Sequence, residues 1–249
     1  MFMFKRNWKV IAILIISITF SSGCNKNPDN ISDGEVSDGL RKTYRKDGSI
    51  LSEANYKNGK LDGVSKNFYD NGNVQNLITY KNGIKDGLVQ TNYKKGNLNR
   101  ETTYKNGLID GYKKIFFKNG KVSSEQHYKS DYPGLLKEFS SSGKEKESYP
   151  ELIIKPVNNI IASGEFILEV TFSENGRRAE YYEGELIDGE FFDEFDVIRL
   201  AEQDGVGLYR IKVNPGERID NTVTLIGVLK TPRRNRYIVQ KSYQLSIRG

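Results

Sequence analysis

The sequence predicts an all-β protein, in which an elongated single-layer antiparallel sheet of β-hairpin repeats precedes an immunoglobulin-like β-sandwich. Three observations lead to this prediction. A 24-residue period runs through the middle of the chain, and each period contains dipeptides typical of hairpin turns. Beyond Pro150 the period stops, and short runs of alternating apolar and polar residues replace it.

The N-terminal residues have the order of a secretory signal. A basic start is followed by an apolar run over residues 10–20 and then by Ser22-Gly23-Cys24. This order resembles a bacterial lipoprotein signal, in which the cysteine after a small residue is lipidated. We therefore expect residues 1–23 to be a lipoprotein signal peptide and Cys24 to carry the lipid. The alternative is an ordinary signal peptide with a chance cysteine.

Residues 24–38 are polar, contain few apolar side chains and are expected to form a flexible tether. Acyl chains on Cys24 would anchor the protein to a membrane that it does not span. In proteins with such signals, an Asp after the cysteine is an inner-membrane retention signal in many bacteria. This chain has Asn25 there, so the resemblance implies a lipid-anchored protein of the cell envelope, at the outer membrane.

Residues 39–149 form the predicted repeat array. The same residue types return every 24 positions, which means that one supersecondary unit is copied along the chain. The periodic tyrosines and the glycines that close each unit are Tyr56, Tyr80, Tyr104, Tyr128, Gly63, Gly87 and Gly111. Between them, Asn58-Gly59 and its counterparts tolerate positive φ at both residues and predict tight hairpin turns. The last unit departs from the pattern over residues 129–134, as terminal repeats often do.

The sequence Tyr-Lys-Asn-Gly-x-x-Asp-Gly recurs at Tyr56–Gly63, Tyr80–Gly87 and Tyr104–Gly111. This motif resembles the bacterial variant of the MORN repeat. The resemblance implies a stack of β-hairpins that forms one elongated, twisted antiparallel sheet. The same repeats make up a bacterial family of toxin–antitoxin antitoxins, so the resemblance also implies an antitoxin role as an alternative function.

Residues 150–249 are expected to form the β-sandwich. Period-two alternation appears in four segments, and a length of about 100 residues suits an immunoglobulin-like domain. The four predicted strands are residues 165–172, 207–213, 222–229 and 237–247.

The composition excludes several kinds of site. Cys24 is the only cysteine and His127 the only histidine, which argues against disulfides, Cys/His zinc sites and most hydrolase mechanisms. No phosphate loop, dinucleotide fingerprint or nucleic-acid motif is present, so we expect no cofactor and no nucleic-acid partner. His127 occupies the position that Asn55, Thr79 and Thr103 hold in other units, and we expect it to be an ordinary strand residue.

The array is basic, since residues 40–134 hold 18 Lys or Arg against 9 Asp or Glu. A lysine follows each periodic tyrosine, and these candidate ligand-binding residues are Lys57, Lys81, Lys105 and Lys129. Such a row would attract anionic headgroups or acidic polysaccharide, or it would maintain solubility and block sheet-edge association. The tyrosines in turn could form a platform for glycans or peptides, or cover the glycines as the core of a thin sheet.

The segment Glu180–Asp196 contains eight acids and no Lys or Arg. It is expected to be a solvated acidic hairpin, or to meet a basic surface such as the protein's own array. Repeat arrays usually bind or hold other molecules, so we expect a non-enzymatic, lipid-anchored protein that binds or scaffolds a protein or acidic glycan. An antitoxin or immunity-type protein is the alternative, and a glycan-directed enzyme is the third possibility.

Overall fold

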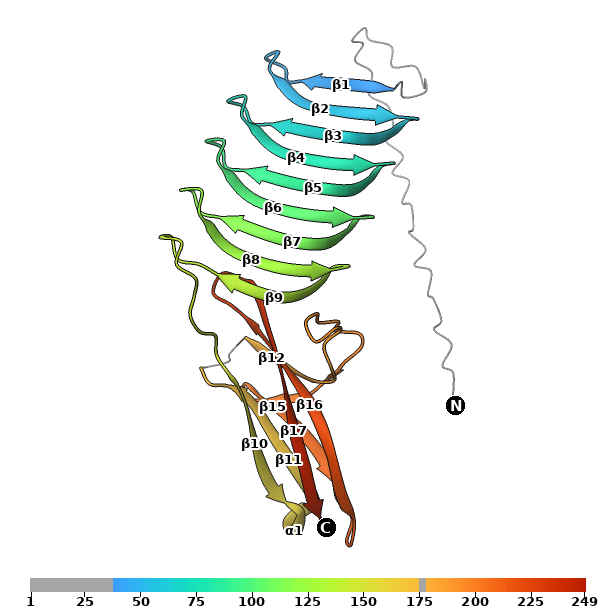
Figure 1. Ribbon diagram of the computed structural model, residues 1–249, viewed down its shortest axis with the longest axis vertical. Coiled ribbons are helices and arrows are strands. Elements are labelled where there is room, and N and C mark those ends of the chain that lie inside the picture. Colours follow the sequence, from blue (N-terminus) through green and yellow to red (C-terminus); the bar gives the residue numbers. More distant parts are fainter. Residues whose placement is uncertain (1–37, 175–177) are drawn as a thin grey trace, which may run out of the picture. The chain divides into compact units, whose positions relative to one another are not determined.

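The computed structural model describes residues 38–174 and 178–249, which fold almost entirely into β-strands (Figure 1). The predicted fold class is confirmed, because one nine-stranded antiparallel sheet in chain order precedes two four-stranded sheets. The strands of the array are β1 (Gly39–Tyr44), β2 (Ile50–Lys57), β3 (Lys60–Phe68), β4 (Val74–Lys81), β5 (Ile84–Asn92), β6 (Leu98–Lys105), β7 (Leu108–Phe116), β8 (Val122–Lys129) and β9 (Tyr132–Glu138).

Tight two-residue turns join the strands at one side of the array. Asn58 and Gly59 have φ values of 49° and 72°, as a type I′ turn requires at both central residues. In the last unit Ser130 and Asp131 adopt φ values of 49° and 71°. The atypical segment 129–134 therefore keeps the turn geometry although it loses the Asn-Gly dipeptide.

The turns of successive units are hydrogen-bonded to one another. The backbone N–H of Gly83 donates to the carbonyl of Leu61 over 2.7 Å, and the N–H of Asn82 donates to the Asp62 carboxylate over 3.0 Å. Both bonds connect one unit to the next, which explains why the Asp and Asn positions recur with the same period. Neighbouring units thus share interfaces beyond the strand ladder.

Each internal unit contains a bulge that requires its closing glycine. Tyr80 pairs with Lys85 and Ile78 pairs with Val89, so that Thr79 alone faces three residues of β5. Gly87 lies in this bulge with a φ of +115°, a conformation that L side chains rarely adopt. The last unit, Tyr112–Gly134, is one residue shorter than the others. His127 faces only two residues of β9, so the residue has been lost from the bulge.

Replacing Gly87 with valine is expected to lower the free energy of unfolding by about 1–3 kcal/mol. A Cβ at this position would lie 3.1 Å from the Thr79 methyl group, in addition to the positive φ. Chemical denaturation would measure the loss, and Leu88→Val on the same strand serves as the control, with an expected cost of about 1 kcal/mol or less. An unchanged midpoint for Gly87→Val would contradict a structural role for the periodic glycines.

The C-terminal residues form two four-stranded sheets, ordered β10-β11-β15-β14 and β13-β12-β16-β17. Their elements are β10 (Leu152–Asn159), α1 (Ile160–Ser163), β11 (Glu165–Phe172), β12 (Ala179–Glu183), β13 (Ile198–Arg199), β14 (Ala201–Gln203), β15 (Val206–Lys212), β16 (Arg218–Lys230) and β17 (Arg236–Arg248). All four predicted strands are present, as β11, β15, β16 and β17.

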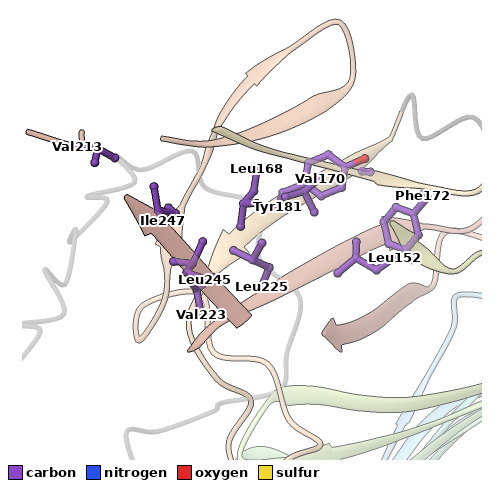
Figure 2. Close-up of a cluster of buried hydrophobic side chains, with 11 residues drawn as sticks. Leu152, Leu168, Val170, Phe172, Tyr181, Val213, Val223, Leu225, Leu245 and Ile247 are labelled. Atoms are coloured by element: carbon purple, nitrogen blue, oxygen red, sulfur yellow. The ribbon is translucent and has the colours of Figure 1, made fainter. Parts of the chain in front are cut away.

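An apolar core lies between these two sheets (Figure 2). Leu168 and Val170 of β11 meet Leu225 of β16 and Leu245 of β17, and all four are at most 1% exposed. Alternating residues of both sheets therefore face inward, as in a β-sandwich. Most of the buried apolar side chains of the described residues therefore lie in the C-terminal part, and few lie in the array.

The sandwich is joined to the last strand of the array, within the compact unit Val36–Gly249. The backbone N–H of Phe192 donates to the carbonyl of Pro133 on β9 over 3.0 Å. Gln126 of β8, which is 4% exposed, donates from its amide to the carbonyl of Arg236 over 2.7 Å. The sandwich thereby covers an edge strand that would otherwise present unpaired backbone groups.

Candidate functional site

The four periodic tyrosines lie on one face of the nine-stranded sheet, which we call the tyrosine face. Directly paired residues of antiparallel strands share a face, and side chains alternate along each strand. The register places the tyrosines opposite glycines of the preceding strands, in the pairs Gly39–Tyr56, Gly63–Tyr80, Gly87–Tyr104 and Gly111–Tyr128. The four tyrosines are half-buried, so they pack over glycines and stay partly exposed.

Cationic side chains lie over three of these rings. The Arg41 guanidinium is 5.3 Å from the centre of the Tyr56 ring. The Lys85 ammonium is 5.1 Å from the centre of the Tyr104 ring, and the Lys113 ammonium is 5.9 Å from that of Tyr128. Arg100 lies on the same face, diagonally across from Lys113. Burial of Lys113, together with the positive charge of Arg100, lowers the pKa of the Lys113 ammonium.

A cation from the sandwich adds to this group. The Arg236 guanidinium lies 5.2 Å from the centre of the Phe192 ring and 3.6 Å from the Glu194 carboxylate. It is also close enough to act on Tyr128, where burial raises the pKa of the phenol and the charge of Arg236 opposes that rise. Positive charge therefore continues from β5 to the first residue of β17.

Neutral polar side chains occupy much of the remaining tyrosine face. Thr102 stands between Val89 and Lys113 in the register, and the Thr91 hydroxyl donates to the Asn76 side chain over 3.0 Å. Further hydroxyl and amide groups on this face belong to Thr43, Ser52, Ser65, Asn67, Ser124 and Gln126. The face combines aromatic rings, cations and uncharged hydrogen-bonding groups.

The opposite face has a different charge pattern. Lysines and glutamates are paired across neighbouring strands in its middle row, and the Lys42–Glu53 and Lys114–Glu125 ion pairs both span 2.9 Å. These cations have carboxylate partners on the neighbouring strand. Lys113 and Lys114 are adjacent in β7 but lie on opposite faces. Lys114 pairs with Glu125, whereas Lys113 has no carboxylate within 4.0 Å among the described residues.

The lysine row predicted from the sequence lies at one side of the array, directly before the tight turns. Lys57, Lys81 and Lys105 are exposed there. Lys129 is exposed as well, but its ammonium forms an ion pair with Asp188 of the sandwich. The row is therefore not uniform, because its last member binds to another part of the same chain.

The acidic segment Glu180–Asp196 contacts the last unit of the array, and this corrects the expectation of a fully solvated hairpin. Glu190 lies 2.8 Å from Nδ1 of His127, and the Asp188 carboxylate meets Lys129. The alternative expectation, that the segment meets the protein's own basic array, is confirmed. His127 also stacks on Tyr112 at 4.8 Å, so it is more than an ordinary strand residue.

Two open hollows of the described surface each contain a glutamate that forms an ion pair. One hollow of about 540 Å³ contains Glu180, which pairs with Arg199 over 3.3 Å. Another, of about 630 Å³, contains Glu147, which pairs with Lys144 over 2.6 Å.

The predicted lipidation site, Cys24, lies outside the described residues, as do the predicted signal peptide and the predicted tether before residue 38. No helix in residues 38–174 and 178–249 is long and apolar enough to cross a membrane.

The repeat is identified by comparison with known families. A family model described as the MORN repeat variant matches residues 37–58, 61–82, 85–106 and 109–130. The chain carries four MORN repeat variants. MORN repeats commonly serve in binding or scaffolding. No curated protein matches the chain.

The matched segments begin before β1 and end in the turn between β8 and β9, so the MORN array continues into β9 beyond the last match. The cations of the tyrosine face were missed by the sequence reasoning, which looked for periodic residues. Lys113 corresponds by the 24-residue period to Arg41, Ser65 and Val89. Departure from the period was the signal that could have marked it.

Proposed function

We propose that this protein is a non-enzymatic, lipid-anchored component of the cell envelope that binds or scaffolds a partner through its MORN array. The observation that carries the proposal is the nine-stranded sheet, which has side chains available on both faces between β1 and β7. Its final strand is held to the sandwich by the buried hydrogen bonds that Glu138 accepts from Thr231 and Asn235. Such a sheet is a preorganised surface, which lowers the entropic cost of binding.

The anchor supports the same proposal. Lipid on Cys24 would restrict the protein to one surface, and the tether over residues 24–38 would set how far the array can reach. Confinement of this kind raises the effective concentration of partners at the membrane, so weak contacts become sufficient for binding. We place the protein at the outer membrane, on the basis of Asn25.

A pair of photocrosslinking variants tests the binding function. Asn67 and Val64 are both exposed on β3, but they lie on opposite faces, since Asn67 pairs with Ser52 and Asn76 on the tyrosine face. A photoreactive amino acid at each position, in the full chain in its native envelope, should give a covalent adduct from at least one face. If neither position forms an adduct, the proposal that the array binds a partner fails.

The antitoxin role stays a prediction from the resemblance of the repeats. Co-expression with the product of a neighbouring gene would test it, because an antitoxin restores growth when its toxin is produced. If co-expression restores growth with none of the products of the adjacent small reading frames, this would count against the antitoxin role.

A further inference from the structure

We propose that the tyrosine face binds a carboxylated oligosaccharide, such as a chain of uronic acids, at Lys85, Arg100 and Lys113. The inference rests on the proposed binding function of the array and names the ligand class and the site. These three cations lie on the consecutive strands β5, β6 and β7. The rings of Tyr104 and Tyr128 lie between and beside them.

The charge balance of this face calls for an external anion. Among the residues that register pairing places on the tyrosine face, Glu138 is the sole carboxylate within the described part of the chain. It is 5% exposed and accepts hydrogen bonds from Thr231 and Asn235 over 2.9 Å and 2.8 Å. None of Lys85, Arg100 and Lys113 has a carboxylate within 4.0 Å in residues 38–174 and 178–249.

Lys113 shows the consequence most clearly. It is half-buried, lies near Arg100 and has a lowered pKa, so its charged form is destabilised by its surroundings. A carboxylate bound between the two cations would remove that cost. The planar guanidinium of Arg100 could hold both carboxylate oxygens, and Lys113 would supply a point charge beside it. Arg236 extends the positive region towards the sandwich.

The other groups on the face favour a sugar over a protein segment. Tyr104 and Tyr128 are two strands apart, which is about 10 Å and comparable to the length of a disaccharide. The edge of a tyrosine ring can contact the apolar side of a sugar, while neutral hydroxyls and amides, such as those of Thr91 and Asn76, suit sugar hydroxyl groups. The hot spots of protein interfaces lie in fully desolvated pockets, whereas Tyr104 and Tyr128 stay partly exposed.

Isothermal titration of the full-length protein in non-ionic detergent with a galacturonate oligomer tests this inference. The wild type is expected to bind the oligomer, with affinity falling as salt rises. Lys113→Gln and Arg100→Gln should each weaken binding about tenfold, because each removes a charged hydrogen-bond donor. Tyr104→Leu should weaken binding several-fold while leaving the charge unchanged.

Two control variants test whether binding depends on these three cations or on the positive charge of the array in general. Lys114→Gln changes the next residue of β7, which faces the opposite side and pairs with Glu125, and it should leave the affinity unchanged. The combined change of Lys57, Lys81 and Lys105 to Gln removes three exposed charges beside the turns and should also leave the affinity within about twofold. If either control weakens binding as much as Lys113→Gln does, the proposed site is wrong.

The probes decide the ligand class. A neutral glucan of equal length should not bind, and polyglutamate or a single-stranded oligonucleotide of equal charge should bind at least tenfold more weakly. Equal or tighter binding of either of the latter, or no binding of galacturonate, would overturn the proposal. Photocrosslinked adducts in the native envelope would still stand in that case, so the binding function of the array would survive while the glycan assignment failed.

Discussion

Replacing Glu138 with alanine is expected to lower the free energy of unfolding by about 2–4 kcal/mol and to uncouple the MORN array from the sandwich. The Glu138 side chain is 5% exposed, and its carboxylate accepts hydrogen bonds from the Thr231 hydroxyl and the Asn235 amide. Both donors are buried as well. Without the carboxylate, two buried polar groups lose their partner, and each costs about 1–3 kcal/mol.

Scanning calorimetry would show the uncoupling. The wild type is expected to unfold in one transition, because the sandwich with its apolar core supports the last strand of the array. Glu138→Ala should give two transitions, the array melting first. Lys137→Ala is the matched control, since Lys137 is the neighbouring residue on the opposite face and lies 4.0 Å from its partner Glu145. A single transition in Glu138→Ala, at the wild-type temperature, would count against a structural junction here.

Most of the array was predictable because the interactions that define its turns and register lie within a few residues along the chain or recur with its period. An Asn-Gly pair defines a type I′ turn within four residues, and the return of Gly87 and Tyr104 with the same period defines the register of the next hairpin. The strands of the sandwich were predictable for the same reason, since alternation shows within seven or eight residues. The pairing of sandwich strands across two sheets depends on contacts that alternation alone does not encode.

The junction was not predictable from the sequence. Gln126 meets Arg236, and Arg233 meets the carbonyl of Ser123 over 2.7 Å, at separations of 110 residues in both cases. Nothing in the sequence marks Gln126 as a long-range donor, because a glutamine on a strand can equally well point to solvent. His127 illustrates the same limit: only the structure shows that Glu190 and Tyr112 lie beside it.

The candidate site also contains residues that the sequence predicted and residues that it did not. The tyrosines and glycines repeat, so the sequence predicted that rings would cover glycines, and the register places them in pairs. Lys85 and Arg100 have no cationic counterpart in the other units, and Lys113 has one only in Arg41, so a search for strict periodicity passes over these cations. The recurring residues of this array form its scaffold, and these are the residues that a repeat pattern identifies. Lys113 and Arg100 do not belong to that pattern, so only the structure identified them as neighbours on one face.

Replacing Cys24 with serine is expected to release the protein from membranes almost completely. Serine has no thiol to accept a lipid, and each buried methylene of an acyl chain contributes about 0.8 kcal/mol to membrane binding. A single chain binds reversibly, whereas two or more chains hold a protein almost permanently. Removal of all of them should therefore move the protein from the membrane pellet to the soluble fraction, which fractionation and immunoblotting would measure.

A second variant separates lipidation from sorting. Asn25→Asp keeps the thiol and should remain membrane-bound, but in bacteria that use the Asp signal it should move to the inner membrane. Mass spectrometry of the wild type should show acyl chains on the N-terminal peptide beginning at Cys24, and the serine variant should lack them. Full membrane retention of Cys24→Ser, at high salt and without acyl chains, would mean that the N-terminal apolar segment itself holds the protein. The lipid anchor would then be wrong, while the MORN array and its tyrosine face would still be presented at the membrane.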